Sequence, residues 1–436
     1  MRRQLIIMTR YPEAGRTKTR LIPALGAAGA AALQREMTEH IVERAWPFAT
    51  AHGIDLVLRF VGGDRERVRQ WLGADLAVEP QGAGDLGQRM THAIAAAFTG
   101  GAQAVVMIGA DCPGVDAAVL DDAFTALDSV DLVLGPAGDG GYYLIGMGRP
   151  EPRLFDGIEW GSSCVLAQTR AVAERVGLVR RELPVRSDVD RPEDLPVWQR
   201  ESRGRPRISV IIPTLDEALY LRPTLRGAAH CAGVELVVAD GGSTDGSPAI
   251  ARELGARIVS TEPGRALQMN AGARVAAGDI LLFLHADTLL PGGYGRFVRT
   301  ALADRDAVAG AFCLAIGGPS RGLRAVARLA NLRARWLGLP YGDQAVFLRA
   351  TTFSQLDGFP ELPIMEDFVM ARRLRKHGRI VTVPATVTTA ARRWNRLGVL
   401  RTTLINQLIV AAFLMGMSPE RIARFYGRRP PRKREP

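Results

Sequence analysis

The chain has little of several features that would mark particular protein classes. Its 436 residues include only four cysteines (Cys112, Cys164, Cys231 and Cys313), which are far apart and form no CxxC pair. This spacing argues against a disulfide framework or a zinc site and favours free thiols in a reducing compartment. Aromatic residues make up 6% of the chain. No RNA-binding signature or zinc-finger spacing is present, so nucleic acid is not an expected partner.

Long hydrophobic runs are also missing. The apolar stretch 404–417 is interrupted by Asn406 and Gln407, and its 14 residues are fewer than the roughly 20 that span a bilayer. It is either a helix packed on its own domain or a helix at a membrane surface, helped by seven Lys and Arg in 421–436. The start of the chain lacks the apolar core of a signal peptide. We therefore expect a cytoplasmic protein, with peripheral contact at the inner membrane face as the alternative.

The chain does have an excess of positive charge and a regular series of apolar segments. The net charge of +11 suits anionic small molecules or a membrane surface. Helical stretches such as 27–51 and 86–99 lie between continuous apolar segments, which indicates mostly parallel sheets covered on both faces. The predicted strands are 4–10, 55–60, 104–111 and 131–138, then 208–214, 235–240, 256–260 and 279–287.

A polar, basic segment at 196–207, PVWQRESRGRPR, interrupts this pattern. We therefore predict two tandem α/β domains, 1–198 and 207–425, joined by a linker at 199–206. The basic end of the chain, 426–436, is expected to be a disordered tail. The two halves share a rhythm of elements but show no close internal repeat.

In the second half, polar side chains follow the predicted strands. The carboxyl ends of parallel strands meet at one edge of a sheet, where ligands bind. A carboxylate there could hold a divalent cation that neutralises a diphosphate; otherwise these groups are solvated loop ends. The side chains concerned are Glu217, Asp240, Ser243, Asp245, His285 and Asp287.

Taken in order, the motifs SVIIPTLDEA, VVADGGSTDGS, GRALQMNAGA, FLHADT and MEDFVMARRL resemble family 2 glycosyltransferases of the GT-A fold. The likeness covers roughly 207–425 and is greatest to a subgroup associated with selenodomain or arsenosugar gene clusters. It implies an inverting transfer from a nucleotide-diphospho-sugar, with a UDP-sugar favoured and with Mg²⁺ or Mn²⁺ as cofactor. The acceptor, a small molecule or a lipid, stays open.

The resemblance also implies roles for matching residues. Asp287 would bind the metal, while His285 replaces the first Asp of the family's Asp-x-Asp motif and would touch ribose or phosphate. Asp240 would contact the base. The nucleotide site would comprise Pro213, Thr214, Glu217, Asp240, Ser243, Asp245, Arg265, Asn270 and His285.

The acceptor side is expected around the segment 363–378. By the same resemblance, Asp367 is the catalytic base and Glu366 supports it, since an acceptor hydroxyl needs a base to take its proton. The alternative is that the two acids only cap a helix N-terminus. Asp343 and Gln344 are further candidates. Arg393 and Trp394 either clamp the diphosphate or stack at the acceptor, or they belong to a basic surface patch.

In the first half, the loop after the first strand carries Arg16, Lys18 and Arg20. A basic loop containing glycine suits phosphates, although the P-loop spacing is absent and a plain basic turn is the alternative. Asp111 ends a later strand, and Asp139 lies in a glycine-rich loop where it could face a ligand and is counted with the phosphate-binding residues. Together with Asp111, Asp188 and Asp190 could bind a metal; alternatively DVDRPEDL is only a turn and helix cap.

Residues 4–200 resemble the nucleotidyltransferase-like family DUF2064, which has a GT-A-like fold. The resemblance implies phosphate binding by Lys18 and Arg20, and Mg²⁺ binding by Asp111 and Asp190. The sequence thus predicts a bifunctional transferase. Two alternatives remain: only the second domain is catalytic while the first binds nucleotide or regulates, or the whole chain is a non-catalytic nucleotide-sugar-binding protein.

Overall fold

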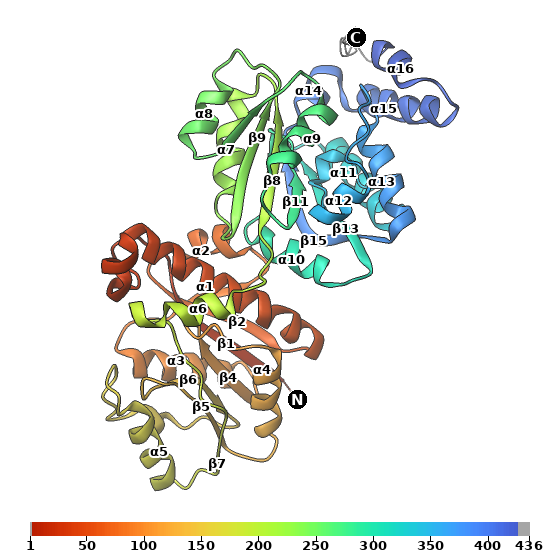
Figure 1. Cartoon of the computed structure of the whole chain (residues 1–436). Helices are drawn as coiled ribbons and strands as arrows, with labels where there is room; N and C mark the ends of the chain where they lie inside the picture. Colours follow the sequence, from red (N-terminus) through yellow and green to blue (C-terminus); the bar gives the residue numbers. More distant parts are fainter. Residues whose placement is uncertain (1, 426–436) are drawn as a thin grey trace. The chain divides into compact units, whose positions relative to one another are not determined.

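The computed structural model describes residues 2–425, apart from the side chain of Arg393. The chain divides into two compact units, Met1–Arg205 and Pro206–Pro436. In each unit, helices cover both faces of a mixed, mostly parallel sheet (Figure 1). The predicted α/β fold class is therefore confirmed. The tail predicted at 426–436 lies outside the described residues.

The first unit has the strand order β3-β2-β1-β4-β6-β5-β7. Strands β1 to β4 are mutually parallel where they pair, and β6 runs antiparallel to β4 and β5. The strands are β1 (Arg3–Arg10), β2 (Asp55–Val61), β3 (Ala77–Pro80), β4 (Ala104–Gly109), β5 (Leu132–Pro136), β6 (Tyr142–Met147) and β7 (Arg180–Glu182). The helices are α1 (Ile22–His52), α2 (Arg65–Leu72), α3 (Leu86–Thr99), α4 (Ala117–Ala126), α5 (Val165–Arg175) and α6 (Leu195–Glu201).

The strands of this unit are apolar throughout because both faces of the sheet are covered. Leu5 and Ile7 of β1 pack with α1, α2 and α4, whereas Ile6 between them packs with α3 and α5. Successive side chains of a strand point to opposite faces. A strand buried on both sides therefore shows no alternation of polar and apolar residues.

The second unit has the strand order β10-β9-β8-β11-β14-β13-β15-β12. Its strands are β8 (Ile208–Thr214), β9 (Val234–Asp240), β10 (Arg257–Ser260), β11 (Ile280–Phe283), β12 (Thr288–Leu289), β13 (Ala307–Ile316), β14 (Phe347–Arg349) and β15 (Arg379–Thr389). Its helices are α7 (Ala218–Ala228), α8 (Ser247–Glu253), α9 (Arg265–Val275), α10 (Tyr294–Ala303), α11 (Arg321–Leu337), α12 (Ala350–Gln355), α13 (Glu366–His377), α14 (Arg392–Leu397), α15 (Val399–Leu414) and α16 (Pro419–Phe425).

The two sheets share one strand order, in keeping with the GT-A-like fold that the resemblances imply for both units. If strands are counted along each unit and the short β12 is left out, both orders read 3-2-1-4-6-5-7. The sixth strand is antiparallel to its neighbours in both units. Strands β4 and β11 therefore occupy equivalent places. They lead into the sequences Gly109-Ala110-Asp111 and His285-Ala286-Asp287.

Three segments differ in detail from their predictions. Helix α6 extends to Glu201, so the first residues of the predicted linker are helical, and Trp198 is buried beside Leu21 and Met37. Strand β11 ends at Phe283, which leaves His285 and Asp287 in a loop. Within residues 2–425, no helix is both long and apolar enough to cross a membrane. The four cysteines, all in described positions, form no disulfide.

Candidate functional site

A wide cavity of about 780 Å³ opens in the first unit, where β1 and β4 end. A volume of this size accommodates a small-molecule ligand. The sequence predicted most of its charged groups, but not Arg10, Arg89, Gln34, Gln81 or the aromatic side chains. The charged and aromatic lining residues include Arg16, Lys18, Arg20, Arg89, Asp111, Asp139, Asp188, Asp190, Tyr142, Tyr143 and Trp160.

Lys18 lies among the predicted metal ligands of this cavity. Its Nζ is 2.7 Å from Asp190 Oδ1 and 3.6 Å from Asp111 Oδ2, and it donates to the carbonyl of Val189 at 2.8 Å. Burial alone would lower the pKa of Lys18, but the neighbouring carboxylates outweigh this effect and raise it. The backbone of Lys18 is left-handed, with φ of 47°, a strained conformation for a residue with a side chain. The loop therefore holds this ammonium group in one place.

The other predicted residues of this unit line the same cavity. Arg20 pairs with Asp190 at 3.0 Å, whereas Arg16 is exposed and lies 3.6 Å from Glu13. Asp139 accepts a hydrogen bond from the Gly141 N–H at 2.9 Å. Burial, followed by the charge of Asp111, raises the pKa of Asp188 to about 6. The predicted carboxylates do converge, but Lys18 lies between Asp111 and Asp190.

No group of three or more His, Cys, Asp and Glu side chains in the described residues is arranged to hold a metal ion. Metal binding in either unit therefore remains a prediction.

In the second unit, hydrogen bonds lock together the loops after β8 and β9. Asp240 accepts from the N–H groups of Gly242 and Ser243 at 3.1 and 3.2 Å. Ser243 Oγ accepts from Asp216 N, and Asp245 accepts from Ala218 N. These contacts order the predicted nucleotide site, and they show that Asp240 and Asp245 also shape their own loop.

Gln268 of α9 forms hydrogen bonds with the backbone at the ends of both β8 and β9. Its Nε2 donates to the carbonyls of Thr214 and Ala239 at 2.7 and 2.9 Å. Pro213 and Thr214 lie at the end of β8, paired with Ala239 and Asp240. The sequence analysis missed Gln268. Its only signal was a polar residue within the apolar part of the GRALQMNAGA motif.

Asp287 and Glu217 face a cation that the sequence did not identify. Arg392 Nη2 lies 2.7 Å from Asp287 Oδ2, and Arg392 Nη1 lies 2.8 Å from Glu217 Oε2. Its guanidinium also lies 4.4 Å from the ring centre of Tyr220. Burial alone would lower the pKa of Arg392, but the bonds to Glu217 and Asp287 raise it. The predicted metal ligand is therefore neutralised by an arginine.

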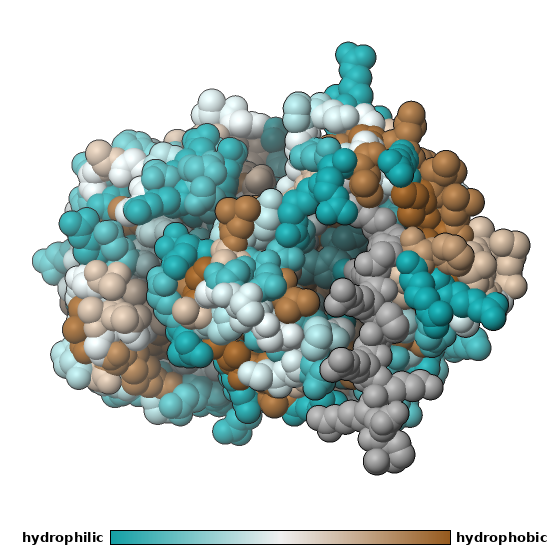
Figure 2. All heavy atoms as spheres, turned by 90° about the horizontal axis from the view of Figure 1, so that it is seen from above, coloured by the Kyte–Doolittle hydropathy of each residue, from teal (hydrophilic) through white to brown (hydrophobic). Residues whose placement is uncertain are grey.

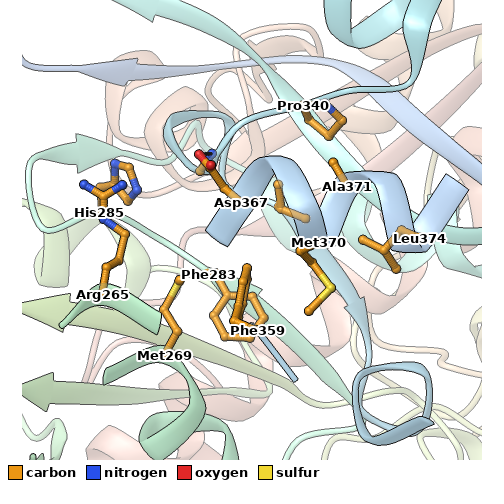
Figure 3. A pocket seen from close by; sticks show the side chains of 12 residues that line it. Arg265, Met269, Phe283, His285, Pro340, Phe359, Asp367, Met370, Ala371 and Leu374 are labelled. Carbon is orange, nitrogen blue, oxygen red and sulfur yellow. Dashed lines mark hydrogen bonds between the residues drawn. The ribbon is translucent and has the colours of Figure 1, made fainter. Parts of the chain in front are cut away.

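The proposed base lies in a small pocket that holds about 20 Å³ of free volume (Figure 3). Asp367 Oδ2 accepts from Gly342 N at 3.0 Å. A Cβ placed on Gly342 would lie 2.8 Å from His285 Nε2 and 3.6 Å from Asp367 Oδ2, so these side chains border the same space. Figure 3 shows Arg265 and His285 on one side and Met269, Phe283, Phe359 and Met370 along the floor.

Two further carboxylates lie beside Asp367. Glu366 is buried, and its Oε1 is 3.3 Å from Arg265 Nη1. Asp343 Oδ1 is buried without a hydrogen-bond partner among the described residues, and burial raises the pKa of Asp343 to about 6. Gln344 is buried and donates to the Phe312 carbonyl. Asp367 thus lines the pocket, with two further carboxylates directly behind it in the fold.

Some predicted residues lie elsewhere or serve the fold. Asn270 exchanges two hydrogen bonds of 2.9 Å with the backbone of Phe359, which occupies its side-chain amide. Trp394 packs against the core of the unit. The side chain of Arg393 lies outside the described residues. Arg392, one position earlier in the same basic run, is the arginine that reaches the site.

Comparisons with known proteins agree with this picture. Residues 46–162 match the family DUF2064, described as an uncharacterized protein conserved in bacteria, and residues 209–352 match glycosyl transferase family 2. The chain joins a DUF2064 region to a family 2 glycosyl transferase region. The predicted resemblances to both families are thus confirmed, and with the strand order they support the predicted GT-A-like fold.

Individual relatives are partial matches. A PGL/p-HBAD biosynthesis glycosyltransferase of Mycobacterium bovis is 43% identical over 94 residues, 20% of this chain and 37% of the relative. The chain thus spans well under half the length of its curated relatives. A solved Desulfovibrio desulfuricans G20 protein, provisionally described as a nucleotide-diphospho-sugar transferase, is 35% identical. The match covers 47% of this chain and 89% of that one, with a TM-score of 0.43.

Glucosyl-3-phosphoglycerate synthase of Mycobacterium tuberculosis, solved with Mn²⁺ and UDP, is a more distant match. It is 20% identical, with a TM-score of 0.36, and the match covers 48% of this chain and 80% of that chain.

Proposed function

We propose that the second unit is an inverting glycosyltransferase that uses a nucleotide-diphospho-sugar donor. The observation that carries the proposal is the position of Asp367. It is held by the Gly342 N–H and borders the same pocket as His285, and both Gly342 and His285 lie within the region 209–352 that matches family 2. Asp367 would take the proton of an acceptor hydroxyl, which is a poor nucleophile until a positioned base removes it. A direct displacement with one base inverts the anomeric centre.

The hydrogen bond to Gly342 positions this base. Because Gly342 N donates to Oδ2 of Asp367, one oxygen of the carboxylate is fixed by the loop before β14. The charge of Glu366 is paired with Arg265, whose Nη1 lies 3.3 Å from Glu366 Oε1. The absence of a side chain at Gly342 keeps open the space between His285 and Asp367. We assign this space to the reacting hydroxyl.

The donor would lie outside this pocket. A free volume of about 20 Å³ holds little more than a water molecule, far less than a sugar nucleotide. The ordered loops after β8 and β9, with Asp240, Ser243 and Asp245, are the surface we assign to the nucleoside. A UDP-sugar is the favoured donor, and the acceptor stays a small molecule or a lipid.

The carboxylate of Asp287 is suited to a cation, because in this structure it already faces the Arg392 guanidinium at 2.7 Å. If Arg392 moves away, Asp287 would hold Mg²⁺ or Mn²⁺ together with diphosphate oxygens. When bound, such an ion would neutralise charge on the leaving diphosphate. We assign to His285, two residues before Asp287, a contact with ribose or phosphate.

The test measures donor binding and turnover separately in the full chain. Thermal shifts with UDP-sugars and Mn²⁺ report binding, and release of UDP in the presence of sugar and lipid hydroxyls reports transfer. Asp367→Asn should keep the shift and lose the release, whereas Asp287→Asn should lose the metal-dependent shift. Glu361→Gln, which changes an exposed acid in the preceding loop, is the matched control. The proposal fails if Asp367→Asn releases UDP at the normal rate, or if no sugar nucleotide binds.

We also propose that the first unit binds a nucleotide, in the manner of a nucleotidyltransferase. The cavity of about 780 Å³ combines Lys18, Arg20 and Arg89 with Trp160, a set that suits phosphates and a base. Nucleoside triphosphates should therefore raise the melting temperature, and Arg89→Ala should reduce the shift. If triphosphates give no shift in folded protein, the nucleotide role of this unit is wrong.

A further inference from the structure

Two neighbouring helices of the second unit have apolar side chains on their outer surfaces. On α11, the buried positions Leu323, Ala327 and Ala330 pack toward the sheet. Leu329, Leu332 and Trp336 project from the other side of the helix, and Trp336 is 80% exposed. The outer side of a surface helix is normally polar. Here it carries two leucines and a tryptophan.

Helix α15 shows the same arrangement. Ile409 and Phe413 pack against the apolar cluster around Phe368, while Leu400, Leu404 and Leu408 are exposed at intervals of one helical turn. Leu400 is 87% exposed. The sequence analysis left open whether this segment packs on its domain or meets a membrane surface. The structure shows that one side packs and the opposite side is uncovered by any described residue.

The two helices are adjacent at both ends. At their starts, a Cβ on Gly322 of α11 would lie 3.2 Å from a side-chain atom of Val399 of α15. Beyond the end of α11, Leu339 and Tyr341 pack in the same cluster as Ile409 and Phe413. We call the exposed side chains of α11 and α15 the α11–α15 face. Figure 2 shows hydrophobic residues gathered on the surface seen from above.

The charged side chains of these two helices have one sign. The stretches 321–342 and 368–419 contain no aspartate or glutamate. Arg321, Arg324, Arg328 and Arg335 lie exposed on α11, and Arg401 lies exposed on α15. A second copy of the chain would bring the same positive charges against this face, which disfavours self-association. A surface that combines apolar side chains with anionic groups would satisfy both features.

We propose that the α11–α15 face docks on an anionic phospholipid bilayer. Leu329, Leu332, Trp336, Leu400, Leu404 and Leu408 insert at the interface between headgroups and acyl chains, and the flanking arginines meet lipid phosphates. The proposal does not depend on the transfer reaction, and its test requires no substrate.

The experiment measures co-sedimentation of the full chain with vesicles. Phosphatidylcholine vesicles containing phosphatidylglycerol should bind the protein, pure phosphatidylcholine should bind it weakly, and salt should weaken binding. Leu332→Ser and Leu404→Ser should each lower the partition coefficient about tenfold. Leu219→Ser, at a residue 78% exposed on α7, is the matched control and should have no effect. Equal melting temperatures would show that the variants are folded.

A second readout tests insertion directly. Brominated phosphatidylcholine in the anionic vesicles should quench tryptophan fluorescence, and Trp336→Phe should remove most of the quenching while retaining binding. The proposal is overturned if anionic vesicles do not bind the folded protein, or if only removal of 426–436 abolishes binding. It is also overturned if light scattering shows a stable dimer that the leucine variants dissociate, because the face would then be covered by a second copy.

Discussion

In each unit an aspartate lies at the end of an equivalent strand and pairs with a cation. The two cations come from different parts of their units. Asp111 and Asp287 each follow the fourth strand of the shared strand order. In the first unit the partner is Lys18, 3.6 Å away, from the loop after the first strand. In the second unit it is Arg392, 2.7 Å away, from the helix after the last strand.

Each cation also pairs with a second carboxylate, and this carboxylate too follows a different strand in the two units. Asp190 follows the last strand of its unit and binds Lys18 at 2.7 Å, whereas Glu217 follows the first strand of its unit and binds Arg392 at 2.8 Å. In the first unit the cation follows the first strand and the second carboxylate follows the last strand. In the second unit this order is reversed. What the two sheets have in common is a cation between two carboxylates at this edge, and the sequence position of each charge is not shared.

The clusters differ in how firmly the cation is held. The side chain of Lys18 is 7% exposed, whereas that of Arg392 is 42% exposed. A buried ion pair is costly to break, while a half-exposed one contributes little. We therefore expect Lys18 to be a fixed part of its cavity and Arg392 to be displaceable by another cation.

Replacing Asp367, the proposed base, should have the largest effect, and this effect should be confined to the second unit. Asp367→Asn is expected to lower the rate of sugar transfer about 1,000-fold, because a general base contributes factors of this order. Triphosphate binding by the first unit should not change. The measurement is UDP release under saturating donor, beside thermal shifts with triphosphates. A loss of both functions would mean that the variant is misfolded or that the units are coupled.

Removing Lys18 tests whether its ammonium group is a fixed part of the first unit. Lys18→Gln leaves Asp111 and Asp190 without their shared buried cation and should destabilise this unit by about 3 kcal/mol. Hydrogen exchange measured by mass spectrometry in the full chain would locate the loss to residues 2–205. Arg16→Gln, at an exposed arginine of the same loop, is the control. Equal protection in both variants would contradict the predicted role.

Each unit also contains a carboxyl group whose pKa is raised to about 6, Asp188 in the first and Asp343 in the second. Since the folded value exceeds the unfolded value near 3.8, ionisation disfavours the folded state, and the free energy of unfolding should fall between about pH 4 and pH 6. Asp188→Asn should therefore stabilise the protein by about 2 kcal/mol above pH 6, allowing for partial exposure, with the gain vanishing near pH 4. Urea unfolding across this range measures it. A constant difference at all pH values would exclude titration as the cause.

The smallest effect on stability is expected at Arg392. Arg392→Gln should cost about 1 kcal/mol or less, because its ion pairs are partly solvated. It should also raise the affinity for Mn²⁺ several-fold if Arg392 and the metal compete for Asp287. Isothermal titration with Mn²⁺, using Arg396→Gln as the control, distinguishes this from a supporting role. Weaker Mn²⁺ binding would show that the arginine helps to build the site.

The fold class could be predicted from local patterns, and so could most residues of the candidate site. Apolar strands such as 208–214 and 104–111 were found because burial on both faces leaves continuous runs of Val, Ile and Leu. Asp367, His285 and Asp287 were predicted as site residues because each stands at a fixed place in a recognisable motif. Gln268 and Arg392 were missed because their roles lie in contacts with residues distant in sequence, Thr214 for Gln268 and Asp287 for Arg392.

The sequence by itself determined the α/β class, the order of the motifs and the residue types at the strand ends. These depend on burial and on local turns, which the order of apolar and polar residues along the chain reflects directly. Only the tertiary structure decided the common strand order of the two sheets, which cation meets Asp111 or Asp287, and which sides of α11 and α15 stay uncovered. Strand pairing, ion pairs and helix packing join residues tens to hundreds of positions apart, so no local pattern specifies them.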